Sequence, residues 1–310
     1  MSNSSANSNG PSTYALLFLM PIFMSSNIII AKPALTHTEP WTLAFLRWGL
    51  ASLILLPFTY RELKARLPLI RENLKLLSFM AFLGMWICGA IVYLALKETS
   101  ATNGTLIYSA APALILALEW LFRGRTVALR EFAGILLAIT GVFIIVTKGS
   151  LGNLLSLQFN SGDLLFALCT LSWAIYSVLI KKSQLQGMST APLFATIAFL
   201  GTIMLAPFAI TEMAITTSVP NTGEIWMSIA GVVLIASLAS FLTYQFSIRT
   251  VGPFIAGMFM YLMTPYGVAM AVLFLGEQLQ MFHYLGFVPI MAGLMLATLP
   301  ASTFRRRAST

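Results

Sequence analysis

Long apolar stretches limit what this chain can fold into more than any other feature of its sequence. About ten of them follow one another along the 310 residues, and each is close to the roughly 20 residues that a helix needs to cross a lipid bilayer. Hydrophobic residues make up 58% of the chain and charged residues 9%, whereas about 25% of the residues of a soluble domain are charged. A soluble protein of this size must cover its surface with polar groups, so we expect an all-α integral membrane protein.

The apolar stretches predict ten transmembrane helices joined by short links. Residues 1–13 are polar, uncharged and rich in Ser and Asn, which predicts a disordered cytoplasmic tail. Residues 301–310 are predicted to form a basic cytoplasmic tail. The ten helices are expected near residues 14–34, 41–60, 74–96, 102–122, 131–147, 163–182, 190–211, 225–248, 252–275 and 282–300.

Basic residues gather in alternate links between the apolar stretches, as they do in cytoplasmic loops. With the N-terminus inside, the outer segments contain only Lys32, Lys97 and Lys148, together with most of the acidic residues. The asymmetry predicts that both termini are cytoplasmic, and it accounts for the net charge of +8 without a nucleic-acid partner. The inner segments contain Arg61, Lys64, Arg66, Arg71, Lys75, Arg123, Arg125, Arg130, Lys181, Lys182, Arg249, Arg305, Arg306 and Arg307.

The second half of the chain repeats the plan of the first half, about 150 residues later. Pro112 and Pro265, for example, lie at matching positions within their apolar stretches. Each half contains five predicted helices, and because five is odd, the second half must enter the membrane upside down. We therefore expect two inverted five-helix repeats, at residues 14–150 and 160–300. Inverted repeats are typical of transporters that work by alternating access, with the substrate site near the bilayer midplane.

Several short motifs follow one another along these repeats. They are Phe45-Leu46-Arg47-Trp48, Tyr93-Leu94-Ala95-Leu96-Lys97, the prolines at 112 and 265, Ser172-Trp173-Ala174-Ile175-Tyr176 and Leu275-Gly276-Glu277. In this order they resemble EamA-type members of the drug/metabolite transporter superfamily, over about residues 14–300. The resemblance implies a multi-pass protein of the bacterial inner membrane that exports amino acids, other metabolites or drugs. The chain departs from the family pattern at Met24, where the family has Trp, and at Gly124-Arg125, where it has Gly-Glu.

Polar and aromatic residues near the middle of the predicted helices are candidates for a substrate cavity. An aromatic cavity with a few hydroxyls and amides suits a neutral, zwitterionic or aromatic small-molecule solute. Packing between helices, or a belt at the membrane interface, would use the same aromatic residues, and the sequence leaves that alternative open. The candidates are Ser25, Ser26, Asn27, Trp86, Tyr93, Tyr108, Trp173, Tyr176, Tyr244 and Tyr261.

Pro112 and Pro265 are predicted to break the fourth and ninth helices, because proline removes a backbone hydrogen bond. Each follows a tyrosine by four residues, so that the two side chains share a helix face. The breaks would act as hinges or expose polar backbone to a cavity. A static kink is the alternative.

Arg47 and Glu119 are the two charges predicted to lie within the membrane. Arg47 is about two turns inside the outer face, where a cation costs about 2.5–3.5 kcal/mol on insertion scales. It would contact an anionic group of the substrate or a gating carboxylate; a structural role, snorkelling or pairing with an acidic residue, is the alternative that we favour. The acidic residues considered for that pairing are Glu39, Glu98 and Asp163. Glu119 is expected to pair with Arg123, four residues further along the helix.

Glycines spaced seven residues apart give the fifth and tenth predicted helices small faces. Gly134 and Gly141 lie in the fifth helix, and Gly286 and Gly293 in the tenth. Such faces permit close helix contact, either within the chain or in a homodimer, and the sequence does not separate the two.

A membrane-embedded enzyme acting on lipid or prenyl substrates is the alternative to a transporter. Such chemistry usually needs paired carboxylates, a metal cluster or a nucleophile with its base. The ten acidic residues lie mostly at loop edges, and Cys88 and Cys169 form no metal-binding motif with the two histidines. We therefore predict no enzyme activity, no metal and no cofactor. A structural or sensory protein is a third hypothesis, disfavoured because no extramembrane domain is predicted. No acidic residue is predicted at mid-membrane, so the energy source stays open.

Overall fold

The computed structural model of the chain describes residues 11–35, 38–99, 101–150, 152, 160–216, 220–275 and 278–299. Every regular element in these ranges is a helix, which confirms the predicted all-α class. Nine helical segments of the described residues are long and apolar enough to cross a membrane.

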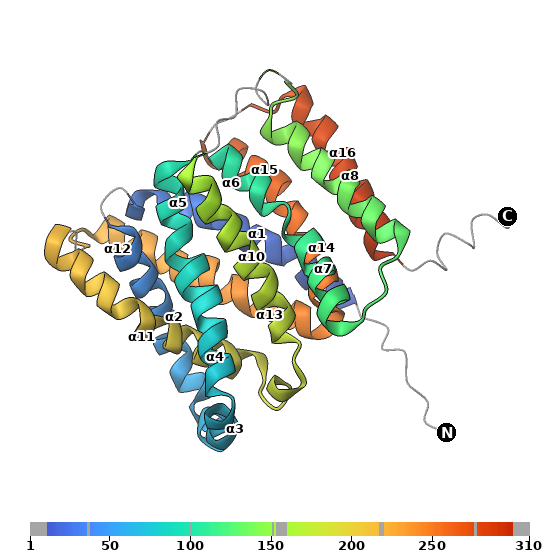
Figure 1. The fold of residues 1–310 in the computed structure, drawn as a ribbon. Coiled ribbons are helices and arrows are strands. Elements are labelled where there is room, and N and C mark those ends of the chain that lie inside the picture. Colours follow the sequence, from blue (N-terminus) through green and yellow to red (C-terminus); the bar gives the residue numbers. More distant parts are fainter. Residues whose placement is uncertain are drawn as a thin grey trace, which may run out of the picture.

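The helices of the first half follow the predicted order (Figure 1). Two of the predicted spans are divided, the third by a π-helix and the fourth by a short break. The elements are α1 (Pro11–Leu35), α2 (Pro40–Ala65), α3 (Leu67–Glu72), α4 (Leu74–Ala81), the π-helix η1 (Phe82–Ile91), α5 (Val92–Glu98), α6 (Ala101–Tyr108), α7 (Ala111–Arg123) and α8 (Leu129–Val146).

The second half divides its spans at matching places. The eighth predicted span of the chain contains a π-helix, and the ninth contains a single 3-10 turn. The elements are α10 (Ser161–Ile180), the 3-10 turn η2 (Ser183–Leu185), α11 (Thr190–Thr216), α12 (Gly223–Gly231), the π-helix η3 (Val232–Ala239), α13 (Ser240–Val251), α14 (Pro253–Phe259), the 3-10 turn η4 (Met260–Leu262), α15 (Met263–Leu275) and α16 (Met281–Thr298).

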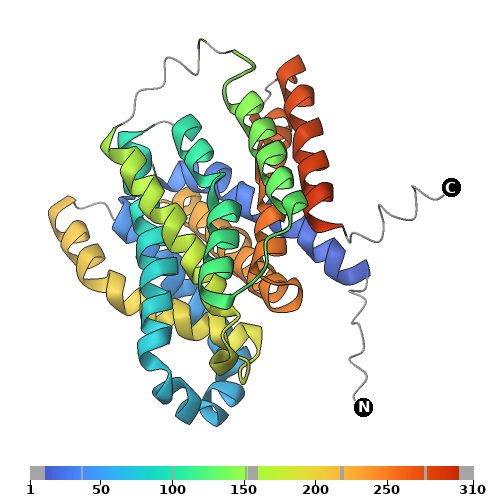
Figure 2. The same cartoon turned by 45° about the vertical axis from the view of Figure 1, so that its right-hand side comes forward.

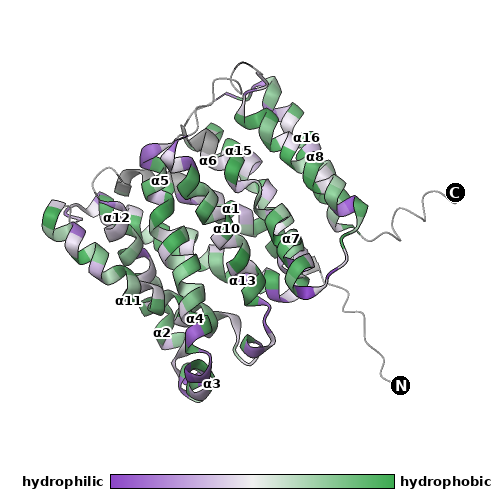
Figure 3. Ribbon diagram, in the orientation of Figure 1, coloured by the Kyte–Doolittle hydropathy of each residue, from purple (hydrophilic) through white to green (hydrophobic). Residues whose placement is uncertain are grey.

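α1 starts earlier than the sequence predicts. It is a helix of 25 residues that begins at Pro11, so residues 11–13, expected in a disordered tail, are helical. Residues 1–10 and 301–310, the remainder of the two predicted tails, and Gly276-Glu277 lie outside the described residues. Hydrophilic residues gather at α3 and at the ends of the longer helices, and apolar residues cover most of their length (Figure 3), as expected of helices that cross a bilayer.

Both predicted proline breaks are present. α6 ends at Tyr108 and α7 begins at Ala111, with Pro112 in its first turn. In the second half, η4 separates α14 from α15, and Pro265 lies in the first turn of α15. Proline fits the first turn of a helix because its missing N–H is not needed there. The proposed hinge motion at these breaks stays a prediction.

The π-helices η1 and η3 mark a second correspondence between the halves. η1 follows the eight residues of α4, and η3 follows the nine residues of α12. A π-helix is rare and is frequently found at a functional site. Neither π-helix was predicted from the sequence, since nothing in the apolar pattern distinguishes a π-helix from an α-helix.

α2 and α11 lie antiparallel, and a glutamate near the end of each caps the start of the other. The Glu212 carboxylate, near the end of α11, accepts hydrogen bonds from the backbone N–H and the hydroxyl of Thr42, at 2.7 and 2.8 Å. At the other end, the Glu62 carboxylate of α2 accepts from the N–H and the hydroxyl of Ser189, both at 2.7 Å. The backbone bonds satisfy N–H groups that a helix start leaves unpaired. The two halves are thus joined by equivalent contacts at both ends of this pair.

α8 and α16 form a second antiparallel pair, seen side by side in Figures 1 and 2. A Cβ atom on Gly134 would lie 2.7 Å from the Gly293 carbonyl, and one on Gly286 would lie 2.6 Å from the Gly141 carbonyl. The four predicted glycines therefore bring the two backbones together within the chain. Of the two alternatives for these glycines, contact within the chain or in a homodimer, the structure shows the first.

Glu212→Ala is expected to lower the free energy of unfolding by about 1–2 kcal/mol, the usual effect of removing a helix cap. Loss of the carboxylate leaves three donors of α2 without a partner, namely the N–H and hydroxyl of Thr42 and the Trp41 N–H, which donates to Glu212 at 3.3 Å. Thermal unfolding of the purified protein in detergent measures the change. Glu72→Ala, at an exposed position, is the matched control and should change the free energy by less than about 0.5 kcal/mol. Equal melting temperatures for the two variants would contradict the role of the cap.

Candidate substrate site

Arg47 lies in the interior of the bundle with only 5% of its surface exposed. Its Nε donates a hydrogen bond to Ser237 Oγ at 2.6 Å and its Nη2 donates to the Ala236 carbonyl at 2.9 Å, both in η3. Its Nη1 donates to the Tyr93 hydroxyl at 2.9 Å. The guanidinium thus bonds to neutral acceptors rather than to a carboxylate, and it connects α2 of the first half with η3 of the second.

Two of the three acidic residues considered as partners of Arg47 make other contacts. Glu39 pairs with Lys97, and Asp163 accepts a hydrogen bond from the Thr99 hydroxyl at 2.5 Å. Among the described residues no ion pair involves Arg47. The alternative in which Arg47 pairs with Glu39, Glu98 or Asp163 is therefore wrong, because the guanidinium bonds to η3 instead.

The Tyr93 hydroxyl extends this polar cluster to a fourth span. It donates to the side-chain oxygen of Asn27, in α1, at 3.3 Å. Arg47, Tyr93 and Asn27, three residues singled out from the sequence, are thereby brought together. We call these three residues together with Ser237 the polar cluster.

Aromatic rings continue from the polar cluster into the bundle. The Arg47 guanidinium lies 4.4 Å from the centroid of the Trp48 ring. Trp48 contacts Phe241 edge-on at 4.8 Å, and Phe241 contacts Trp173 at 5.4 Å. Trp173 in turn stacks on Tyr244 at 4.9 Å and lies 5.6 Å from Tyr176.

The predicted cavity residues Trp173, Tyr176 and Tyr244 thus form one aromatic cluster with Trp48 and Phe241. All five are buried. Ser177 shares a hydrogen bond with the Tyr244 hydroxyl at 2.7 Å. The side chains are packed against one another, so an opening movement is needed before a solute can reach them.

Three polar atoms in this region have no hydrogen-bond partner. They are Nε1 of Trp48, Oε1 of Gln245 and the hydroxyl of Tyr261. Gln245 uses its other side-chain atom, Nε2, to donate to the Tyr176 hydroxyl at 2.7 Å. Leaving a buried polar atom unpaired costs about 1–3 kcal/mol, so such atoms are candidates for contact with a ligand.

Three other predicted residues make contacts of a different kind. Trp86 packs on the side of the bundle against Trp41 and Phe208, with ring centroids 5.1 and 5.4 Å away. It therefore does not join the aromatic cluster. Tyr108 contacts Phe166 edge-on at 6.3 Å, and Tyr261 lies next to Met260, whose sulfur accepts a hydrogen bond from the Trp173 indole.

The predicted Ser25 and Ser26 bond to their own helix, each donating its hydroxyl to a carbonyl three residues earlier. They satisfy backbone groups of α1 rather than groups of the polar cluster. Pro265 lines an apolar groove of about 470 Å³ between α15 and α16.

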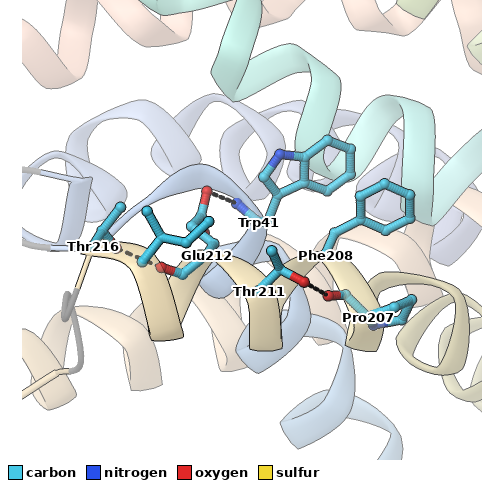
Figure 4. A pocket seen from close by; sticks show the side chains of 7 residues that line it. Trp41, Pro207, Phe208, Thr211, Glu212 and Thr216 are labelled. Atoms are coloured by element: carbon cyan, nitrogen blue, oxygen red, sulfur yellow. Dashed lines mark hydrogen bonds between the residues drawn. The ribbon is translucent and has the colours of Figure 1, made fainter.

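A second groove, of about 540 Å³, lies where α11 ends beside the start of α2. Figure 4 shows Glu212 reaching towards Trp41. The Phe208 ring stacks on the Trp41 indole, with the ring centroids 4.7 Å apart. The sequence analysis did not select this place. The Glu212 carboxylate serves the helix cap described above.

At the opposite end of the bundle, Arg125 connects buried carboxylates of two helices. Its Nη2 lies 2.6 Å from Glu131 of α8, and its Nε lies 4.0 Å from Glu119 of α7. Its guanidinium also lies 4.7 Å from the ring centroid of Phe254, in α14. The predicted pair of Glu119 with Arg123 is present as well, at 3.6 Å. The departure from the family pattern at Arg125 is thus explained by a network that joins both halves.

Lys181, just beyond the end of α10, lies near this network. It donates to the Arg249 carbonyl at 2.8 Å. Burial lowers the pKa of the Lys181 amine, and the positive charge of Arg123 lowers it further. No group of three or more His, Cys, Asp and Glu side chains is placed to hold a metal ion in the described ranges.

Comparison with known proteins decides the family. The model of the EamA-like transporter family matches the chain twice, at residues 11–147 and 160–299. The chain belongs to the EamA-like transporter family. Together with the apolar helices, this match makes the protein a multi-pass membrane protein.

Similar EamA-like proteins align over almost the full length. An uncharacterized transporter of Archaeoglobus fulgidus is 29% identical over 92% of this chain and 97% of its own length. The uncharacterized transporter YyaM of Bacillus subtilis is 27% identical over 92% and 93%. A probable amino-acid metabolite efflux pump of Salmonella typhimurium is 25% identical over 91% and 93%.

The fold also matches a solved protein. A crystal structure with 17% sequence identity superposes with a TM-score of 0.75, over 97% of this chain and 100% of the other. At this identity the match concerns the fold alone.

Proposed function

We propose that this EamA-like protein is a secondary transporter that exports a small organic metabolite, such as an amino acid or a drug-like compound, by alternating access. The polar and aromatic clusters between the two halves would bind the solute. The observation that carries the proposal is the contact of Arg47, in the first copy of the family model, with Ser237 and Ala236 in the second.

The antiparallel helix pairs support an inverted relation between the two copies. α2 and α11 hold the same place in their copies, and so do α8 and α16. Each pair runs antiparallel, as its contacts at both ends require. Two copies of opposite direction give ten spans, with α1 as the first, and this is the layout from which alternating access arises.

The membrane orientation is proposed from the distribution of basic residues. Arg61, Lys64 and Arg66 lie at the end of α2, and the Arg125 network lies at the same end of the bundle as Lys181. By the positive-inside rule this end would face the cytoplasm, with both termini inside. A bacterial inner membrane fits this topology.

Transport is tested with purified protein in sealed liposomes loaded with labelled solutes. The panel contains amino acids, other metabolites and drug-like compounds. Release of at least one solute faster than from protein-free liposomes is expected. If no member of a broad panel moves faster than in the control, the transporter proposal is abandoned.

Tyr261→Phe is expected to weaken solute binding without harming the fold. The Tyr261 hydroxyl is buried and unpaired, so its removal costs no hydrogen bond within the protein. If the solute bonds to it, the KM should rise about three- to tenfold, the equivalent of one hydrogen bond. Tyr60→Phe, at a residue that is 56% exposed, is the matched control. An unchanged KM for Tyr261→Phe would remove this residue from the site.

A further inference from the structure

The buried charge of Arg47 has no anionic partner among the described residues. Its three nitrogens donate to two hydroxyls and one carbonyl, all of them neutral. Two other buried charges, Glu119 and Glu131, are differently arranged, since both lie near the cation Arg125. Because a buried cation is costly without a counter-charge, Arg47 is the position at which an anionic group is missing.

We propose that Arg47 binds the carboxylate of the transported solute, an inference that rests on the proposed transport function. A guanidinium carries five N–H donors in a planar fork that matches a carboxylate. The protein occupies three of them. A guanidinium and a carboxylate frequently form two parallel N–H···O bonds, which adds energy and geometric specificity, so a carboxylate competes successfully with Ser237 Oγ and the Ala236 carbonyl.

The surroundings of Arg47 indicate what the rest of the solute is like. The indole N–H of Trp48, whose ring lies under the guanidinium, has no acceptor. The Phe241 ring lies 5.9 Å from the guanidinium as well, and it contacts Trp48 on one side and Trp173 on the other. A solute with an anionic group at one end and an apolar or aromatic remainder fits a guanidinium that is followed by aromatic rings. The substrate class is therefore a small organic carboxylate, with or without an amino group.

Binding at Arg47 also changes the contact between the two halves. Ser237 and Ala236 belong to η3, and the guanidinium is bonded to both. A carboxylate that takes Nε and Nη2 releases η3 from α2. The bonds to the solute would replace those of Arg47 to Ser237 and Ala236, which hold the two halves together. Solute binding would thus favour the opening movement that exposes the packed aromatic cluster.

The test uses matched solutes that differ only in the carboxylate. Phenylalanine and leucine are compared with their amides, both as labelled solutes in liposomes and as ligands in thermal unfolding of the purified protein. For the wild-type chain we expect at least about a tenfold preference for the acid. Arg47→Gln should abolish this preference, and Arg47→Lys, which keeps the charge, should restore part of it.

Several outcomes would overturn the inference. It fails if the wild-type chain handles acids and amides alike, or if Arg47→Gln keeps the preference for acids. If no solute is transported, the transport proposal fails, and the inference is then decided by thermal unfolding. The acids must raise the melting temperature of the wild-type chain and not that of Arg47→Gln.

A second variant decides the matter if Arg47→Gln does not fold. Ser237→Ala keeps the guanidinium and removes a neutral acceptor that competes with the solute. We expect it to lower the KM for the acid by about threefold, in proportion to one neutral hydrogen bond, and to leave the KM for the amide unchanged. An unchanged or higher KM for the acid contradicts the role of Arg47.

Discussion

Gly134→Ala is expected to lower the free energy of unfolding by about 3 kcal/mol, at the upper end of the range for adding a methyl group to a packed interior. The new Cβ would lie 2.7 Å from the Gly293 carbonyl, and 2.8 and 2.9 Å from the Cβ and N of Ala297. Backbone atoms on a facing helix move only if the whole helix moves. α8 and α16 would have to separate along their length, and a drop in the melting temperature of the detergent-solubilised protein would report this.

Gly267→Ala is the matched control for this substitution. Gly267 also lies inside a helix, α15, but a Cβ there meets nothing within 4 Å. Alanine is the better helix former by up to about 1 kcal/mol, so this variant should be as stable as the wild type or slightly more so. If both alanine variants melt at the same temperature, close contact between α8 and α16 does not stabilise the fold.

Arg125→Ala is expected to lower the free energy of unfolding by about 3 kcal/mol, because removing one partner leaves buried charges uncompensated. The side chains of Glu131 and Glu119 are only 8% exposed. Glu131 loses its closest cation, and Glu119 loses the more distant of its two cations. The value lies at the low end of the usual range since the Arg125 side chain is itself 30% exposed. The contact with Phe254 is lost as well, so α14 should become easier to separate from α7.

Arg123→Ala is the matched control for Arg125→Ala. Arg123 is 37% exposed and lies 3.6 Å from Glu119, and a partly exposed pair of this kind contributes less than about 1 kcal/mol. Adding Glu131→Gln to Arg125→Ala removes one stranded charge and should recover part of the lost stability. Unfolding in detergent measures all three variants. If Arg123→Ala proves the more harmful of the two single changes, the arrangement around Arg125 is wrong.

Local patterns were sufficient for much of the fold. Apolar stretches of spanning length predicted the helices, and the proline positions predicted the breaks before α7 and α15. The pair of Glu119 with Arg123 followed from a spacing of four residues. Each of these features depends on residues close together in the chain, which is why the sequence alone could reveal them.

The candidate site depended on contacts between distant segments. Arg47 was selected from the sequence, but its partners Ser237 and Ala236 follow it by about 190 residues. The caps that Glu62 and Glu212 provide were missed for the same reason. Trp86 was selected with the aromatic residues, yet it packs on the side of the bundle with Trp41.

What the sequence by itself determined about this protein is its membrane solvent, its helical class and the residues that break a helix or place a charge in it. Only the tertiary structure decided which side of each helix faces the partner half. The physical reason lies in the solvent. Lipid is as apolar as a helix interface, so an apolar side chain fits equally well on either side. In a soluble protein the face of a helix that contacts water carries polar residues. The burial of Trp173 and the position of Trp86 could then have been predicted from the sequence.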